Sequence, residues 1–269
     1  MARRNIIALA AACVLAIVAI FLVVYYVLVD TGSNPITRSP GNVVLTVEQA
    51  LAAEEGQMVN VSGAVVATAD RMVLASALLE SYPPQAGKPS LSLKGLDLKA
   101  LVGLSSSTGR SDVSEVTWTD YWVVLTGVIE NGVLLVQSTP RVIEAEVADL
   151  KVRFSPVSEP ISAGDQVWWA LDVMNTGQSA VELTFASGQR GDVVLSQAGR
   201  EKYRWSAGKF FAEAIETVSL KAGENLPVVL NDKIAVPAGE YDLTAIVTAV
   251  AGADRSTTLP ELRTVLRVH

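Results

Sequence analysis

Cysteine and histidine are almost missing from this 269-residue chain. The single cysteine, Cys13, allows no disulfide within one copy and no thiolate metal site. The single histidine is the last residue, His269, which removes histidine-based acid–base catalysis and histidine-rich metal sites. The sequence also shows no serine with a base, no Gly-rich phosphate loop and no evident carboxylate site. It therefore predicts a protein that is not an enzyme, with no catalytic residue, no cofactor and no metal.

Positive charge is also scarce, and the formal net charge is −7. Residues 43–147 hold six Lys and Arg against twelve Asp and Glu, a net charge of −6, and residues 148–269 hold twelve against fifteen, a net charge of −3. Because phosphate binding needs clustered Lys and Arg, nucleic acid is not an expected partner. Hydrophobic residues make up 50% of the chain and charged residues 18%, which indicates folded domains rather than disorder.

One long apolar run, Ile6–Val29, follows the pair Arg3-Arg4. About 20 apolar residues cross a bilayer as a helix, so residues 1–30 predict a single-pass transmembrane anchor. The arginines place the N-terminus in the cytoplasm and the remaining chain in an extracytoplasmic location at the cell membrane. A cleaved signal peptide or a lipoprotein site at Cys13 is the less favoured alternative. Residues 31–42 are rich in Gly, Pro, Ser and Asn and predict a linker.

Residues 43–147 carry short runs in which apolar and polar residues alternate. Thr46 can cap a short helix over 47–54. The dipeptide Asn131-Gly132 between two apolar runs predicts a tight hairpin, since both residues tolerate positive φ. With a helical turn within 96–104, the pattern predicts a five-stranded, OB-like small β-barrel. The expected strands are 58–66, 72–79, 90–93, 121–129 and 133–137.

The segments EGQMVNVSGAVV and WVVLTGVIENGVLLVQSTPRV resemble the membrane-anchored OB domains of the haem-chaperone CcmE type. The histidine that attaches haem in that family has no counterpart here, so haem is not expected. We interpret three aromatic residues as core and hairpin residues rather than as residues that stack on nucleic-acid bases: Trp118, Tyr121 and Trp122. The ligand of this barrel stays open.

Residues 148–269 contain successive strand-like runs separated by Gly, Pro and Asn turns, which predicts an immunoglobulin-like β-sandwich. Within 166–174, Trp169 and Leu171 fall on one face, and Trp168 and Asp172 on the other. Tyr241 follows a Pro-Ala-Gly turn and is expected to return its hydroxyl to the backbone, as a corner tyrosine does.

A motif of spaced polar and aromatic residues lies between positions 175 and 214. It comprises Asn175, Ser187-Gly188-Gln189, Asp192, Gly199, Arg204-Trp205-Ser206 and Phe210. This pattern resembles the BsuPI family, known as intracellular proteinase inhibitors. The resemblance covers roughly the last 120 residues and implies that this domain binds a protease and inhibits it. Two positions depart from the family pattern: Gly191 stands where an aromatic residue is usual, and Glu213 where a Gln is common.

Four polar residues of this stretch are the candidate partner-binding residues: Gln189, Arg190, Ser206 and Lys209. Trp205 and Phe210 are expected to anchor the core, because large aromatic side chains are more often buried than exposed. The triplet Arg190-Gly191-Asp192 spells an integrin-type motif and is interpreted as accidental.

Two further functional hypotheses remain open beside the protease-binding one. The sandwich and barrel can serve as an adhesion or scaffold module that docks envelope proteins or glycans without touching a protease active site. The barrel can also carry a small ligand. The sequence does not decide the protein partner, the inhibitory loop or the oligomeric state.

Overall fold

The computed structural model describes residues 43–107, 115–156 and 161–269. These residues fold mainly as β-strands, which confirms the predicted mainly-β class. The predicted membrane helix Ile6–Val29 and the linker 31–42 lie outside the described residues. Among the residues that are described, no helix has the length and apolar character that a bilayer crossing requires.

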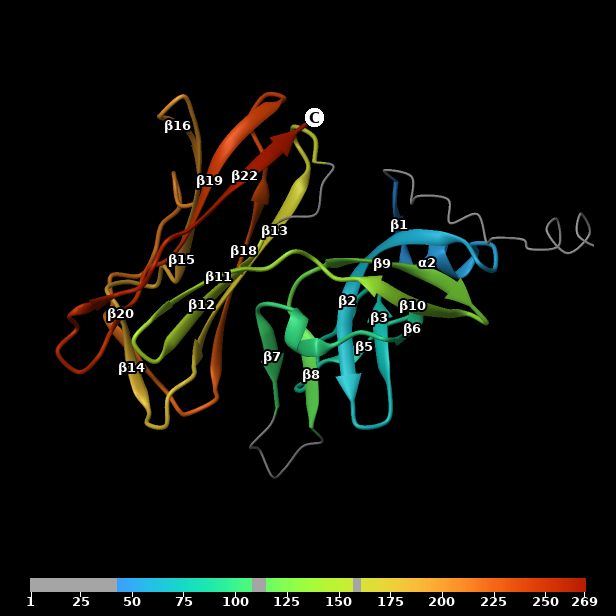
Figure 1. Ribbon diagram of the computed structural model, residues 1–269, viewed down its shortest axis with the longest axis horizontal. Coiled ribbons are helices and arrows are strands. Elements are labelled where there is room, and N and C mark those ends of the chain that lie inside the picture. Colours follow the sequence, from blue (N-terminus) through green and yellow to red (C-terminus); the bar gives the residue numbers. More distant parts are fainter. Residues whose placement is uncertain (1–42, 108–114, 157–160) are drawn as a thin grey trace, which may run out of the picture. The chain divides into compact units, whose positions relative to one another are not determined.

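Five strands close into a barrel: β2 (Met58–Thr68), β3 (Met72–Ala75), β6 (Ser90–Lys94), β10 (Val133–Ser138) and β9 (Val123–Glu130). The order runs β2-β3-β6-β10-β9 and returns to β2 (Figure 1). Neighbouring strands pair antiparallel except β6 and β10, which are parallel. The five-stranded barrel predicted from the alternating pattern is confirmed.

Side chains fill the barrel interior. Along β9 the burial pattern alternates, and Val123, Leu125 and Ile129 point inward. Leu91 and Leu134 are fully buried beside them in one apolar cluster. The barrel is therefore a packed core rather than a container.

The hairpin between β9 and β10 turns at Asn131 and Gly132, whose φ angles are 50° and 71°. Both residues adopt the positive φ that a tight hairpin turn requires, as the Asn-Gly dipeptide predicts. The predicted turn is confirmed.

Thr46 caps the α-helix α2 (Val47–Leu51), which ends three residues earlier than predicted. The Gln49 amide donates to Thr46 Oγ1 (3.2 Å) and the Thr46 amide donates to Gln49 Oε1 (2.9 Å), which completes a capping box. The predicted helical turn within 96–104 is a single 3₁₀ turn, η1 (Leu98–Ala100). The remaining elements of the barrel part are β1 (Val44–Thr46), β4 (Leu78–Leu79), β5 (Gln85–Ala86), β7 (Leu104–Ser106) and β8 (Val116–Thr119).

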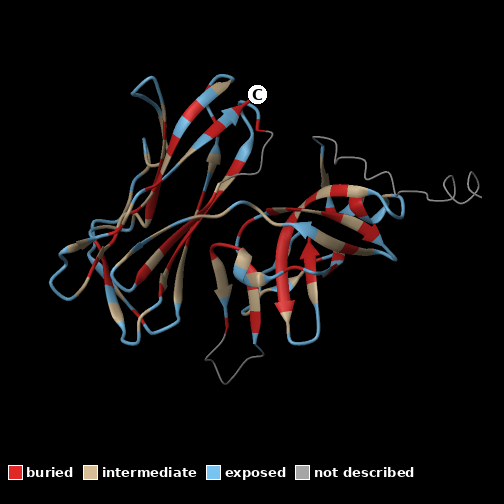
Figure 2. Cartoon of the chain, in the orientation of Figure 1, coloured by how far each residue is buried: buried red, intermediate tan, exposed pale blue. Residues whose placement is uncertain are grey.

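Three four-stranded antiparallel sheets follow and share one apolar core. Phe154, Trp169 and Phe185 are fully buried in it, and the Phe154 and Trp169 rings stack 6.4 Å apart. Buried residues alternate with more exposed ones along two strands of the third sheet of this β-sandwich, residues 239–247 and 262–268 (Figure 2). The first sheet contains β11 (Ile143–Val147), β12 (Leu150–Ser155), β13 (Gln166–Asn175) and β18 (Asn225–Lys233). The second contains β17 (Glu216–Leu220), β14 (Val181–Phe185), β20 (Val250–Ala251) and β21 (Thr257–Thr258), and the third β16 (Arg200–Arg204), β15 (Gly191–Gln197), β19 (Gly239–Val247) and β22 (Leu262–Val268).

Strand β13 is buried on both faces. Trp169 and Leu171 enter the sandwich core, as the alternation predicts. On the opposite face, Ala170 is buried and Trp168 half-buried, and both pack with the apolar cluster of the barrel. The sheet therefore has no solvent face at this strand, which is why a polar residue there, Asp172, is fully buried.

Asp172 is neutralised by Arg153, its directly opposite neighbour on β12. Arg153 donates from Nε (2.9 Å) and Nη2 (2.6 Å) to the two carboxylate oxygens, a bidentate pair. The Gly103 amide of the barrel part donates to the same carboxylate (2.9 Å), and Arg153 Nη1 donates to the Lys99 carbonyl (2.9 Å). Burial and then the charge of Asp172 raise the pKa of Tyr121, which stays protonated and donates to the Val102 carbonyl.

The corner tyrosine lies as predicted. The Tyr241 hydroxyl donates to the Pro237 carbonyl at 2.7 Å, and the ring is buried in the sandwich core. This bond fixes the turn before β19 to the strand itself.

Candidate functional site

The four candidate residues lie on two connections of the sandwich. Gln189 and Arg190 precede β15, and Ser206 and Lys209 follow β16. The second connection, residues 205–215, joins β16 to β17, which belong to different sheets; we call it the 205–215 loop. The two connections are joined by one backbone hydrogen bond, from the Gly188 amide to the Ala212 carbonyl (2.9 Å).

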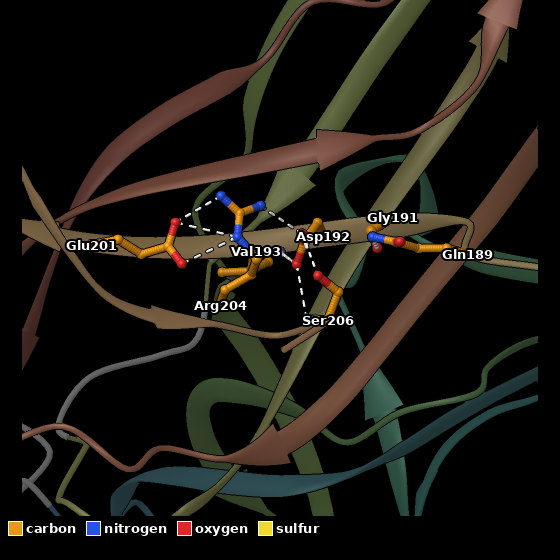
Figure 3. A network of polar contacts seen from close by, with 7 residues as sticks. All are labelled: Gln189, Gly191, Asp192, Val193, Glu201, Arg204 and Ser206. Atoms are coloured by element: carbon orange, nitrogen blue, oxygen red, sulfur yellow. Dashed lines mark hydrogen bonds and ion pairs between the residues drawn. The ribbon is translucent and has the colours of Figure 1, made fainter. Parts of the chain in front are cut away.

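Asp192, on β15, holds the start of the 205–215 loop (Figure 3). Its Oδ1 accepts from the amides of Val193 (2.9 Å) and Ser206 (3.1 Å). Its Oδ2 accepts from the Ser206 hydroxyl (2.7 Å) and from Arg204 Nη1 (2.9 Å). Arg204 is held in turn by Glu201, and Figure 3 shows its guanidinium between the two carboxylates.

This arrangement fixes the start of the 205–215 loop to β15. A carboxylate offers about four acceptor positions, and four donors occupy those of Asp192. The Asp192 carboxylate is therefore fully hydrogen-bonded, and two of its four donors belong to Ser206. Among the described residues, no group of three or more His, Cys, Asp or Glu side chains is placed to bind a metal ion.

Trp205 is the centre of the second set of contacts. Its ring is partly buried against the sandwich core, and its Nε1 donates to the Asn231 carbonyl (2.9 Å). The Phe211 ring lies 5.8 Å from it, and Lys209 Nζ lies 5.0 Å from its centroid. The prediction that Trp205 packs on the core is confirmed, and this ring also supports the loop that follows it.

Lys209 pairs with Asp232 on β18 at 3.0 Å. Burial raises the pKa of Asp232, but the hydrogen bonds from Lys209, from the Lys233 backbone and from Tyr203 together outweigh it. The pKa of this carboxyl therefore lies below its ordinary value. The ion pair of Lys209 with Asp232 thus ties the 205–215 loop to β18.

Phe210 corrects the sequence prediction, since it is not a core residue. Its relative exposure is 101%, so the whole side chain lies in solvent. The physical reason is its position between two clamped neighbours: Lys209 and Phe211 both turn to Trp205, and the side chain between them points away.

Arg190 and Gln189 are engaged within the sandwich. The Arg190 guanidinium lies over the Phe185 ring at 4.2 Å and pairs with Glu216. The Gln189 side-chain amide donates to the Gly191 carbonyl (3.2 Å), and the Gln189 backbone carbonyl accepts from the Thr248 hydroxyl. These contacts connect β15 to its neighbours and leave both residues half-buried.

The Arg190-Gly191-Asp192 triplet is not displayed as a recognition motif, since Asp192 is buried and Arg190 is paired. Gly191 is closely packed. A Cβ added there would lie 3.0 Å from both the Ile246 carbonyl oxygen and Val228 Cγ1. A side chain at this position, such as the aromatic residue that is usual in the family, would require these neighbours to shift.

The four candidate residues stay a prediction as partner-binding residues, and each of them contacts other parts of the sandwich. Ser206 and Lys209 hold the loop, whereas Phe210 is the residue that the loop displays. Asp192 belongs to the BsuPI-like motif of residues 175–214. Its occurrence there together with Ser206 is the sequence feature that could have indicated the hydrogen bonds between them.

Comparisons with known proteins agree with the motif. The family model BsuPI, described as intracellular proteinase inhibitor, matches residues 157–252, so the resemblance predicted for the C-terminal region is confirmed. No curated protein matches this sequence. One similar solved structure is a β-glucosidase from Listeria innocua in complex with gluconolactone, with 13% identity and a TM-score of 0.26. That match covers 44% of this chain and 16% of that chain.

Proposed function

We propose that this protein binds a protease through its C-terminal sandwich and inhibits it. The family match to BsuPI at residues 157–252 supports a proteinase-inhibitor-like function. The observation that carries the proposal is the 205–215 loop, which is held by contacts from Trp205 to Ala212 and exposes one aromatic side chain. We propose in addition that the protein has no enzymatic activity.

A clamped loop favours tight binding because little conformational entropy is lost on association. Flexible loops lose the freedom of every side chain and backbone angle that the complex orders. Here Asp192, Trp205 and Asp232 already fix the residues on either side of Phe210. Little of the free energy gained from contacts with the protease is therefore lost in ordering the loop.

The test uses the full-length protein in detergent micelles and a panel of serine proteases that differ in their specificity pockets. We expect competitive inhibition of at least one class, measured with chromogenic peptide substrates. Neither inhibition nor binding across the whole panel would exclude the protease-inhibitor function and favour the scaffold hypothesis. Proximity labelling in intact cells then identifies the neighbours of a scaffold.

We also propose that the protein is anchored in the cell membrane with its folded part outside. The support is the apolar run Ile6–Val29 after Arg3-Arg4. Protease added to intact cells should then digest an epitope placed at the C-terminus. Protection of that epitope until the cells are lysed would contradict the proposed location.

The domain division at 147/148 and the OB-type and immunoglobulin-like assignments are part of this proposal. The barrel order β2-β3-β6-β10-β9, with one parallel pair, supports an OB-type barrel. The corner bond of Tyr241 supports the immunoglobulin-like assignment.

Small-ligand binding is a second candidate function, and a cavity rather than the barrel interior favours it. The interior is filled by apolar side chains. A cavity of about 340 Å³ is lined in part by Trp122 and Trp168, whose rings lie 5.6 Å apart. Native mass spectrometry of the purified protein tests this function, since a bound mass that Trp122→Ala abolishes is the expected result. A bare protein mass would count against it.

A further inference from the structure

Phe210 is the most exposed large apolar residue in the part of the chain that the structure describes. Within the described residues the other exposed large apolar side chains keep part of their surface covered, from 67% exposure at Val43 down to 38% at Trp122, whereas Phe210 is at 101%. A single exposed apolar residue is ordinary on a protein surface. Phe210 differs from such a residue because the residues on both sides of it are held by contacts with the sandwich.

The chain is fixed immediately before and after Phe210. On the N-terminal side, Lys209 is held by Asp232 (3.0 Å) and lies 5.0 Å from the centroid of the Trp205 ring. On the C-terminal side, the Phe211 ring packs on the same Trp205 ring, and the Ala212 carbonyl accepts from the Gly188 amide. One aromatic side chain is thus presented on a backbone that other residues hold still.

We propose that Phe210 is the anchor residue that enters the specificity pocket of the target protease, and that this pocket is an apolar slot. The inference rests on the proposed function and specifies the class of protease. Serine proteases select the inserted side chain by the pocket floor, which is a hydrophobic slot in some enzymes and a carboxylate in others. A phenyl ring fits the first kind.

The nearest cation does not offer an alternative anchor. The Lys209 amine is engaged by Asp232 and by the Trp205 ring, and its side chain is only 32% exposed. A carboxylate-floored pocket would have to pull this lysine out of both contacts. After Phe210, the exposed charged residue of the loop is Glu213, which does not suit such a pocket.

Three variants of the full-length protein test the assignment against one protease with an apolar slot and one with a carboxylate floor. The variants are Phe210→Ala, Phe210→Arg and the matched control Ile215→Ala, which removes an apolar side chain 66% exposed in the same loop. We expect Phe210→Ala to raise the inhibition constant for the apolar-slot enzyme by about thirty-fold or more, the size of an interface hot spot. Ile215→Ala should change it by less than about three-fold, since most interface truncations are near neutral.

Phe210→Arg should weaken inhibition of the apolar-slot enzyme and create inhibition of the carboxylate-floored enzyme. This gain cannot come from misfolding, so it separates specificity from stability. An unchanged inhibition constant for Phe210→Ala, or an equal loss in Ile215→Ala, would overturn the assignment while leaving inhibition by the wild type intact. If the wild type inhibits no member of the panel, the proposed function fails first, and the assignment with it.

Discussion

Asp172 and Asp192 are two buried aspartates of the sandwich, and each pairs with an arginine from a neighbouring strand. The Asp172 pair is enclosed on both sides, with side-chain exposures of 0% for Asp172 and 9% for Arg153. The Asp192 pair lies at the surface, where the side chain of Arg204 is 38% exposed. The same two residue types thus serve different purposes: one pair neutralises a charge between the barrel and the sandwich, and the other positions a loop.

The two pairs differ in what can hydrogen-bond the aspartate when its arginine is removed. Water can reach Asp192 from the side of Arg204, so a lost arginine is partly compensated. Around Asp172 the Gly103 amide is the remaining donor from the barrel part, and the described structure leaves the carboxylate no exposed surface. Breaking a buried pair is therefore expected to cost several times more than breaking a surface pair.

Arg153→Met should show the largest effect. It leaves Asp172 charged and buried without its partner, which typically lowers the free energy of unfolding by about 3–5 kcal/mol. The double variant Arg153→Met with Asp172→Asn should regain part of that loss, because no unpaired charge remains. Urea denaturation followed by tryptophan fluorescence measures both, and an equal loss in a Lys151→Met control on the same strand would contradict the burial argument.

Asp192→Asn should have the next largest effect. It weakens charge-assisted hydrogen bonds to Arg204 and to Ser206, at about 1.5–3 kcal/mol of unfolding free energy. Arg204→Met should cost about 1 kcal/mol or less, since that side chain is well exposed. Protease inhibition should fall in Asp192→Asn because the loop loses its support. If Arg204→Met destabilised the protein as much as Asp192→Asn, water would not be compensating for the lost arginine. The proposed difference from the Asp172 pair would then be wrong.

Lys209→Met should give a smaller effect that depends on pH. The pKa of Asp232 is lowered in the folded state, so its contribution to stability is fully present above the ordinary Asp pKa of about 3.9. That contribution is lost as the pH falls through the folded pKa. At pH 7 the variant should be less stable than the wild type by at most about 1 kcal/mol, and the gap should narrow as the pH falls below about 3.9. Chemical denaturation at neutral and at acid pH measures this, with Lys202→Met as a charge-matched control on β16; a gap that does not narrow in acid would contradict the assignment.

Phe210→Ala should have the smallest effect on stability. A side chain that contacts nothing leaves the free energy of unfolding within about 0.5 kcal/mol of the wild type. Thermal unfolding by circular dichroism checks this on the same samples used for inhibition. A loss comparable to that of Asp192→Asn would mean that the side chain packs on the protein after all.

The sequence predicted those parts of the fold that depend on local pattern. Alternating valines and leucines indicated the barrel, and Asn131-Gly132 indicated its tight hairpin. The Pro237–Tyr241 turn indicated the corner bond. These features depend on strand periodicity and on backbone conformations that few residue types adopt.

The parts that were missed depend on contacts between distant segments. Asp172 alternates like a solvent-facing residue, and nothing near it in the sequence tells that a second sheet covers its side of β13. Phe210 was assigned to the core because large aromatic side chains are usually buried. In the structure its two chain neighbours, Lys209 and Phe211, contact the Trp205 ring, and Phe210 between them is exposed.

The hydrogen bond from the Gly103 amide to Asp172 has a consequence for hydrogen–deuterium exchange. Gly103 lies between η1 and β7, outside any strand, where amides normally exchange quickly. Its partner is a fully buried carboxylate on β13, so its deuterium uptake requires that this contact opens. The exchange rate of this one amide therefore reports how often the barrel part releases the sandwich, and comparison with the central amides of β13 separates that local opening from global unfolding.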